Sequence, residues 1–253
     1  MNSILTGNNV SFFKKKDTLT PVNYESIAVD MHSHVLPGID DGAQDVSQSV
    51  DLIVRMMESG IKKIIATPHV MADYYRNTPE TIGNALAILK TELKRQMIDI
   101  EVEAAAEHYF DETFEARVND HKLFTMGDNY ALFELSFISL PMNVIGVITR
   151  MKELGYKPIL AHPERYSYLD IEQLKNLRDW GCDLQINTIS LTGYYGKDAK
   201  KMAEAMVDNE IVDFISSDMH HLRHASAFKK ALDTSYVQRL LQDYPLKNTL
   251  LLK

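Results

Sequence analysis

Short apolar runs alternate with longer amphipathic stretches along most of this chain. The short runs suit buried strands, and in the longer stretches apolar residues recur at helical spacing. The pattern predicts seven strands, at 26–31, 62–67, 100–107, 130–137, 157–162, 183–188 and 212–218. It predicts helices between the first two strands and near 79–96, 111–119, 142–154, 169–180, 197–209 and 223–242. In the first helix, Asp45 fits an N-cap and Gly60 fits a left-handed C′ position.

Strands that alternate with helices indicate an α/β fold with a parallel sheet and right-handed crossovers. No glycine-rich G-x-G-x-x-G segment follows the first strand, which favours a closed or nearly closed barrel over an open nucleotide-binding sheet. We therefore expect one barrel domain over 26–253. Residues 1–25 read as a polar extension, with Phe12 and Phe13 as candidate contacts to the domain.

Composition narrows the class of protein further. The 253 residues are 45% hydrophobic and carry a net charge of −8, which suits a globular domain and argues against a nucleic-acid partner. The single cysteine, Cys182, cannot form an intrachain disulfide and fits a reducing compartment. No stretch of about 18 apolar residues occurs, so we expect a cytoplasmic protein without a transmembrane segment.

Imidazole and carboxylate side chains stand at the carboxyl ends of six of the seven predicted strands. In chain order they are His32, His34, Asp41, His69, Glu107, His108, Glu134, His162, Asp218 and His220. Only the sixth strand, which ends near Asn187, lacks an obvious ligand. The carboxyl ends of parallel barrel strands open on one face, so we expect these groups to converge there.

This set of side chains predicts a metal centre. It contains no thiolate and holds too many donors for one ion, which suits two or three divalent ions of borderline hardness such as Mn²⁺, Zn²⁺ or Fe²⁺. Glu107 lies midway along the series and is our choice to bridge two ions about 3.5–4 Å apart. The negative charge of the four carboxylates does not fully neutralise the positive charge of three divalent ions. The loaded site would therefore favour an anionic substrate such as a phosphate ester.

Arg165 follows His162 by three residues and is a candidate for gripping phosphate oxygens with its planar guanidinium. The alternative is an ordinary surface ion pair with Glu164 or Asp170.

The segments "DMHSHVLPGIDDG", "TPH", "AAEHY", "FELS", "AHPERY" and "SDMH" resemble the PHP (polymerase and histidinol phosphatase) superfamily in order and spacing. Within it they are most similar to the bacterial tyrosine-protein phosphatases of capsular and exopolysaccharide loci. The resemblance implies a distorted seven-stranded (β/α) TIM-like barrel with a trinuclear site, usually activated by manganese, with Fe²⁺, Zn²⁺ or Mg²⁺ as alternatives. The implied metal ligands are His32, His34, Asp41, His69, Glu107, Glu134, His162, Asp218 and His220.

The resemblance also assigns the remaining residues. Arg165 corresponds to an arginine of phosphate binding and catalysis, and Arg223 is a weaker candidate for a second basic substrate contact. His108 is left out of the ligand set because many relatives carry an apolar residue there.

The implied reaction is hydrolysis of phosphotyrosine by a metal-activated hydroxide, without a phosphoenzyme. Asp218 or a nearby histidine would assist proton transfer to the leaving group. The implied substrate is a phosphotyrosine-bearing protein, such as a bacterial tyrosine kinase that controls capsular or exopolysaccharide synthesis.

Other functions stay open or are disfavoured on the residues themselves. The sister activity is hydrolysis of a small ester such as histidinol phosphate, and an inactive metal-loaded barrel that tethers a kinase is a third reading. A cysteine phosphatase is excluded, because Thr188 stands where Cys-x5-Arg would require arginine. Tyr74, Tyr75, Tyr194 and Tyr195 fall in loops where they would either flank a phosphotyrosine ring or simply pack.

Overall fold

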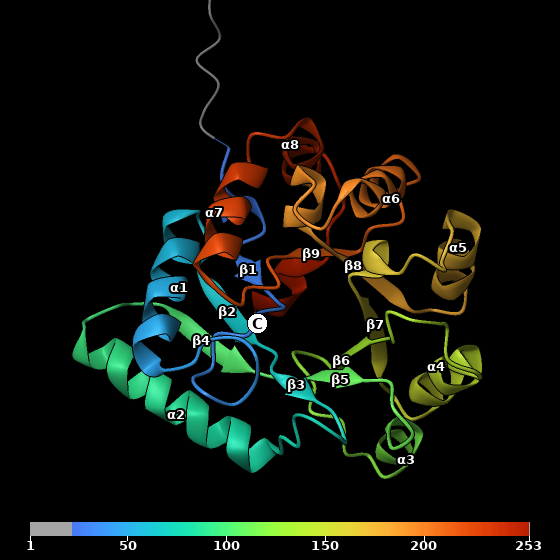
Figure 1. The fold of residues 1–253 in the computed structure, drawn as a ribbon, viewed down its shortest axis with the longest axis horizontal. Coiled ribbons are helices and arrows are strands. Elements are labelled where there is room, and N and C mark those ends of the chain that lie inside the picture. Colours follow the sequence, from blue (N-terminus) through green and yellow to red (C-terminus); the bar gives the residue numbers. More distant parts are fainter. Residues whose placement is uncertain (1–21, 253) are drawn as a thin grey trace, which may run out of the picture.

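The computed structural model describes residues 22–252, so Phe12, Phe13 and the rest of the predicted extension up to residue 21 lie outside it. Within the described part, strands run parallel at the centre and helices surround them (Figure 1). The sheet orders are β1-β2-β4 and β3-β5-β6-β7-β8-β9. The strands are β1 (Val29–Asp30), β2 (Lys63–Ala66), β3 (His69–Val70), β4 (Glu101–Ala104), β5 (Glu107–Tyr109), β6 (Tyr130–Glu134), β7 (Lys157–Ala161), β8 (Asp183–Asn187) and β9 (Phe214–Ser216).

Apart from β2 and β4, which lead into β3 and β5, the strands are followed by helical or 3-10 structure, as the alternating pattern predicts. The α-helices are α1 (Val46–Glu58), α2 (Pro79–Arg95), α3 (Phe114–Asn119), α4 (Val144–Glu153), α5 (Ile171–Asp179), α6 (Lys197–Asp208), α7 (Leu222–Ala231) and α8 (Ser235–Gln242). The 3-10 helices are η1 (Tyr24–Ser26), η2 (Pro163–Arg165), η3 (Thr188–Thr192) and η4 (Asn248–Leu252). The helix expected near 223–242 is in fact two, because the Thr234 side chain accepts from the Val237 amide and caps a new helix.

The expectation of seven continuous strands needs correction, since the described residues form nine shorter ones. The predicted 62–67 strand ends at Ala66 and resumes after Pro68 as β3, and the predicted 100–107 strand is divided into β4 and β5. Pro68 has no amide hydrogen for the ladder, which explains the break. Its carbonyl accepts from the Glu107 amide at 3.1 Å, so the two interruptions lie side by side.

Backbone contacts also link the segments that follow β1 and β9, the first and last strands of the described residues. Ser33 forms a parallel bridge with Met219, the Asp218 amide donates to His32 O at 2.9 Å, and the His34 amide donates to Met219 O at 2.8 Å. A small apolar core lies among strands of both sheets, with η4 contributing to it. It contains Val29, Met31, Ile65, Ala105, Met126, Tyr130, Leu132, Ile159, Ala161, Phe214 and Leu251. A larger core fills the space between strands and helices.

The start of the described chain packs closely on its last third. The Tyr24 ring stacks on Phe228 with centroids 4.0 Å apart, and its hydroxyl donates to Phe228 O at 3.0 Å. Gly60, at φ +106, passes so close to the Tyr24 backbone that a Cβ there would lie 3.0 Å from its nitrogen. Asp45 caps α1 by accepting from the Gln48 amide, and Gly60 follows the C-cap residue Ser59 with a positive φ, so both predicted ends of that helix are confirmed.

Candidate metal centre

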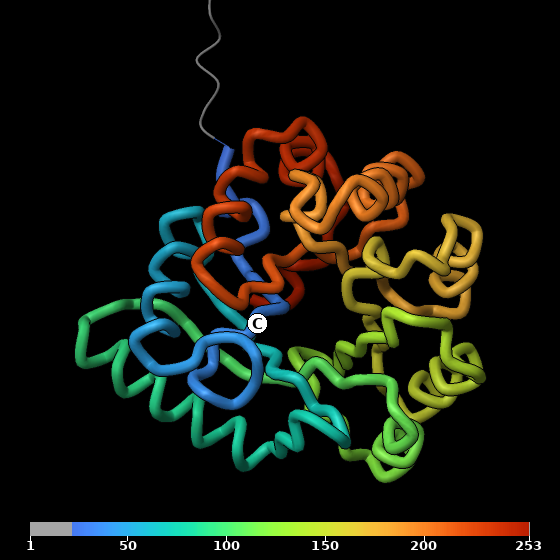
Figure 2. Tube along the Cα trace, in the orientation of Figure 1, coloured from blue at the N-terminus to red at the C-terminus, as the bar shows by residue number. Residues whose placement is uncertain are grey.

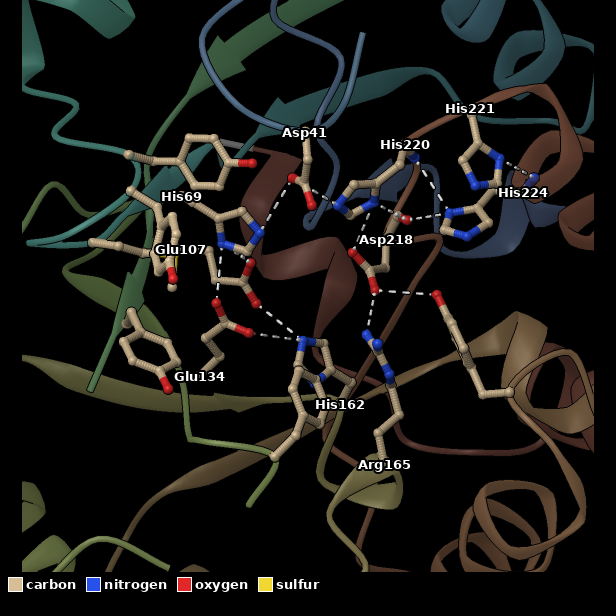
Figure 3. A pocket seen from close by; sticks show the side chains of 16 residues that line it. Asp41, His69, Glu107, Glu134, His162, Arg165, Asp218, His220, His221 and His224 are labelled. Atoms are coloured by element: carbon tan, nitrogen blue, oxygen red, sulfur yellow. Dashed lines mark hydrogen bonds and ion pairs between the residues drawn. The ribbon is translucent and has the colours of Figure 1, made fainter. Parts of the chain in front are cut away.

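The strand ends bring the nine predicted metal ligands to one place. Figure 3 shows seven of them pointing toward one another around a pocket, with carboxylates between imidazoles. Four overlapping groups have donor atoms close enough to share an ion: His34, Asp41, His69 and His220; His32, Glu107 and His162; His32, His34 and Asp218; and His69, Glu107 and Glu134.

Glu107 lies at the centre of this cluster, as predicted for a bridging carboxylate. Its Oε1 is 3.3 Å from His32 Nε2 and 3.1 Å from His162 Nε2, and its Oε2 is 3.4 Å from His34 Nε2 and 3.0 Å from His69 Nδ1. Burial would raise the pKa of this carboxyl, but the neighbouring imidazoles, His32 foremost, hold it well below its usual range. Glu107 is therefore a buried carboxylate anion.

Hydrogen bonds outside the cluster fix how the histidine rings face it. His32 Nδ1 donates to Gln185 Oε1 at 2.9 Å, and His34 Nδ1 lies 2.8 Å from Asp40 Oδ2. His220 Nδ1 lies 2.9 Å from Asp218 O. Partners of this kind orient metal-binding imidazoles and leave the other ring nitrogen for the ion.

Strand β8 contributes no ligand but contributes a buried chain of amides. Gln185 Nε2 donates to Asn187 Oδ1 at 2.9 Å, and Asn187 Nδ2 donates to Asp218 Oδ2 at 2.7 Å. With the Gln185 contact to His32, this amide chain joins two predicted ligands through hydrogen bonds that all run in one direction. Sequence reasoning missed it, although two amides at alternate positions of a buried strand are a usable signal.

The two aspartates of the "IDDG" segment have different surroundings. The Asp41 side chain is 51% exposed, and its Oδ1 lies 3.5 Å from His69 Nε2 and 3.4 Å from His220 Nε2. Asp40 is buried; its Oδ1 accepts from the Gly42 amide, and its Oδ2 faces His34. Asp41 therefore faces the pocket as predicted, while Asp40 is a supporting residue that sequence reasoning missed.

Several buried polar atoms of the cluster make no hydrogen bond. His69 Nδ1 and Glu107 Oε2 are among them: they lie 3.0 Å apart as an ion pair, without hydrogen-bond geometry. Unsatisfied buried polar atoms are costly and need an explanation. A divalent cation held by nitrogen and oxygen donors fits this arrangement, so the residues present suit the implied metal ions.

Two ligand positions adopt a backbone conformation that L-residues rarely use. His162 has φ +35° and Asp218 has φ +51°, both in the left-handed region. Non-glycine residues held in this way store strain and cluster at functional sites.

The pocket above the cluster has a volume of about 510 Å³, and Arg165 forms one side of it. Its Nη1 lies 3.1 Å from Asp218 Oδ2, and its guanidinium carbon lies 4.7 Å from the Phe137 ring and 4.1 Å from the Tyr195 ring. Burial would lower the pKa of Arg165, but Asp218 raises it, so the group stays charged. The arginine is thus held between two aromatic faces, and Figure 3 shows it beside the cluster.

Neither residue offered as a surface partner of Arg165 pairs with it. Glu164 is buried and accepts from the Ser190 hydroxyl at 2.6 Å, and Asp170 caps α5 by accepting from the Gln173 amide.

The predicted loop tyrosines divide into two groups. Tyr74, Tyr75 and Tyr195 line the pocket, while Tyr194 is not among its lining residues and packs edge-on to His224. Tyr109 and Phe137 also line it, and sequence reasoning missed both.

Three other residues singled out in the sequence lie away from the centre. Arg223 is exposed and lines a separate hollow with Gln48 and Asp51, so the structure does not bring it to the pocket. The reason is that it lies on α7, and spacing from "SDMH" did not define the face on which its side chain emerges. His108 accepts from the Phe124 amide, and burial and then Arg117 lower its pKa to about 3. Cys182 is buried, and burial raises the pKa of its thiol.

None of the helices in residues 22–252 is both long and apolar enough to cross a lipid bilayer.

This chain is similar to known proteins over most of its length. Residues 28–248 match the family described as capsular polysaccharide synthesis, CpsB/CapC. The tyrosine-protein phosphatase YwqE of Bacillus subtilis is 30% identical over 198 residues, which are 77% of this chain and 78% of that protein. The putative tyrosine-protein phosphatase CapC of Staphylococcus aureus is 27% identical over 207 residues, 81% of each chain.

A solved structure from the same group of proteins has a similar fold. A structure from work on YwqE of Bacillus subtilis and CpsB of Streptococcus pneumoniae, described as unique metal-dependent tyrosine phosphatases, matches with a TM-score of 0.75 and 28% identity. The match covers 87% of this chain and 89% of that one. The lactonase Lmo2620 of Listeria monocytogenes, at 13% identity and a TM-score of 0.52, shares the fold alone. On the family match over residues 28–248, this chain belongs to the CpsB/CapC family of capsular polysaccharide synthesis.

Proposed function

We propose that this chain is a metal-dependent protein-tyrosine phosphatase. The observation that carries this proposal is the juxtaposition of Arg165 with the ligand cluster. The guanidinium lies between Phe137 and Tyr195 and contacts Asp218, so a phosphoryl group on the metal centre would also meet a fixed cation. The relatives named as tyrosine-protein phosphatases support the same activity.

The nine clustered side chains would hold two or three divalent ions, with Glu107 as the bridge. Mixed imidazole and carboxylate donors without thiolate suit Mn²⁺, our first choice, as well as Fe²⁺, Zn²⁺ and Mg²⁺. When bound, such ions polarise phosphoryl oxygens and lower the pKa of bound water to about 7.

The chain's own residues supply positioning and charge. Arg165 donates to phosphoryl oxygens from a guanidinium whose plane is fixed by the two rings. Asp218 faces Arg165, His32 and the Tyr195 hydroxyl, which donates to its Oδ2 at 3.4 Å. Burial would raise the pKa of Asp218, but His32 foremost among its neighbours holds it well below the usual range. We therefore propose that Asp218, or a nearby histidine, would relay a proton from the attacking water to the leaving oxygen, although a phenolate of pKa about 10 needs little assistance.

Aromatic side chains favour an aryl phosphate over an alkyl one. Tyr75, Tyr109, Phe137 and Tyr195 surround the pocket and offer ring faces and edges to a phenyl group. Aromatic pairs contribute about 0.5–1.5 kcal/mol beyond their buried area. This is the feature that favours phosphotyrosine over histidinol phosphate.

The wider setting of the proposal follows from the family. We propose that the substrate is a phosphotyrosine-bearing protein, such as a tyrosine kinase of capsular or exopolysaccharide synthesis, and that the chain acts in the cytoplasm. We also propose that residues 26–253 form one domain, in which the two sheets make a distorted barrel of seven βα units. The bridge between Ser33 and Met219 supports that closure.

The test compares a phosphotyrosine peptide with histidinol phosphate, each with and without Mn²⁺. We expect manganese-dependent cleavage of the peptide, lost in His34→Ala and in Arg165→Ala. A preference for histidinol phosphate by orders of magnitude would move the assignment to a metabolic phosphatase. Absence of metal-dependent hydrolysis of both would contradict the proposal.

A further inference from the structure

The loop between β6 and α4 exposes a run of large apolar side chains. Phe137, Ile138, Leu140 and Met142 are 46%, 90%, 42% and 93% exposed, and we call residues 137–142 the apolar loop. Figure 2 shows the course of the chain that connects β6 to α4 and contains this segment. Exposed apolar residues that are contiguous, unlike single ones, mark an interaction surface.

The base of the apolar loop is held by hydrogen bonds. The Tyr168 hydroxyl donates to Ser136 O at 2.5 Å, and the Tyr166 hydroxyl accepts from the Leu135 amide at 2.9 Å. The Ile138 amide donates to Ser136 Oγ at 3.2 Å. A surface anchored in this way costs less entropy to order when a partner binds.

The apolar loop is continuous with the pocket over the metal centre. The Phe137 ring lies 5.8 Å from the His162 ring and contacts Arg165, so the first residue of the loop is part of the pocket wall. Its later residues lead to a groove of about 350 Å³. Leu140, Pro141, Val144 and Ile145 line one side of it, and Leu169 and Leu177 the other.

We propose that the apolar loop and this groove bind the residues flanking the phosphotyrosine in an extended segment of the substrate protein. They would select segments with a large apolar side chain near the phosphotyrosine. The inference rests on the proposed function, because it is the phosphate in the pocket that sets the peptide across Phe137.

Two other occupants are less well supported. The groove lining contains no lysine or arginine, so an anionic membrane would gain no electrostatic attraction there. A stable dimer interface buries about 800 Å² on each partner, more than the side chains of one short loop present. A concave groove that the apolar loop connects to the pocket wall at Phe137 fits an extended peptide better.

The test uses two phosphotyrosine peptides that differ only in leucine or serine beside the phosphotyrosine, with p-nitrophenyl phosphate as a small aryl ester. They are assayed on the manganese-loaded wild type, on the double variant Ile138→Ser with Met142→Ser, and on Met97→Ser. Met97 is a matched control, since it is 90% exposed in the turn after α2.

We expect the wild type and Met97→Ser to prefer the leucine peptide by about tenfold in kcat/KM, the order of effect of burying one large apolar side chain in part. The double variant should lose that preference through KM while hydrolysing p-nitrophenyl phosphate within about twofold of wild type. The inference would be overturned if the double variant kept the preference for the leucine peptide, or if the wild type showed no such preference. In either case, hydrolysis of the small ester would still uphold the proposed function. Loss of a dimer on sedimentation of the double variant, with peptide kinetics unchanged, would overturn the inference in favour of a second copy. Failure of the wild type on all three substrates would overturn both.

Discussion

The Nε2 atoms of His32 and His34 lie 3.3 Å apart in the buried floor of the pocket. Both rings are held from outside, His32 by Gln185 and His34 by Asp40, so both turn the same kind of atom inward. Two facing lone pairs repel unless a cation lies beside them. In the ion-free chain a proton on His34 relieves this repulsion. Burial lowers the pKa of His34, but the opposing groups, Asp40 foremost, raise it to about 10.

Metal binding should therefore release protons. Because His34 is protonated at pH 7 in the ion-free chain and must be neutral to bind an ion, the apparent affinity for Mn²⁺ should rise with pH between about 6 and 9. Titration calorimetry in buffers of different ionisation enthalpy measures the protons released. A binding enthalpy that is independent of the buffer would contradict this account.

The same shift sets the sign of the pH effect on the ion-free protein. The folded pKa of His34 lies above its ordinary 6.5, so its contribution to the free energy of unfolding is fully present below about pH 6.5 and is lost as pH rises toward 10. We expect the Tm of the chelated protein to fall over that interval. The manganese-loaded protein, which has exchanged the proton for an ion, should not show the same fall and is the control.

Asp40→Asn should weaken metal binding without removing a ligand. The amide keeps the size of the carboxyl but no longer offers a charged acceptor to His34 Nδ1, and loss of such a partner typically costs about 10–100-fold in metal affinity. Asp51→Asn, on the exposed side of α1, is the matched control. Equal Mn²⁺ affinity in the two variants would show that Asp40 does not orient His34.

Gln185→Leu should affect both the metal centre and the fold. The substitution removes the acceptor for His32 Nδ1 and the donor to Asn187, and each buried polar group left unpaired costs about 1–3 kcal/mol. Thermal unfolding should show a lower Tm without metal and a smaller rise on addition of Mn²⁺. Gln242→Leu, at the exposed end of α8, removes an exposed amide for comparison. An unchanged rise with Mn²⁺ in Gln185→Leu would contradict an orienting role of the amide chain.

Arg165→Lys should lose activity while keeping its metals. Lysine preserves the charge but not the planar fork held between Phe137 and Tyr195. We expect kcat on a phosphotyrosine peptide to fall by about 100-fold, the scale seen when one donor to a transition-state oxyanion is removed. The Tm shift with Mn²⁺ should stay near that of wild type. Full activity in this variant would show that the fork does not contact the phosphoryl group.

The sequence identified the clustered imidazoles and carboxylates better than the residues that support them. These side chains are recognisable because their types are unusual at strand ends, and Glu107 lies at the centre of the cluster. Asp40, Gln185 and Asn187 are ordinary polar residues until the fold places them behind the cluster, so no local pattern marked them as supporting residues.

The fold was predictable to the level of its alternating elements and no further. Apolar runs located the strands, but the interruptions after Ala66 and Ala104 depend on how Pro68 meets the neighbouring strand. Likewise, Tyr24 falls within the predicted polar extension, and its burial against Phe228 is a contact across 204 positions that no local pattern contains.

The left-handed backbone at Asp218 suggests a way to identify the physiological partner. Asparagine tolerates that conformation nearly as well as aspartate, whereas most other side chains do not. Asn187 Nδ2 would still find an amide oxygen to donate to, so Asp218→Asn should fold with its pocket intact but turn over slowly. Because such a variant would bind a phosphorylated protein without dephosphorylating it quickly, it could be used to capture the substrate from cells. This single substitution would leave the binding surface nearly the same as in the natural protein.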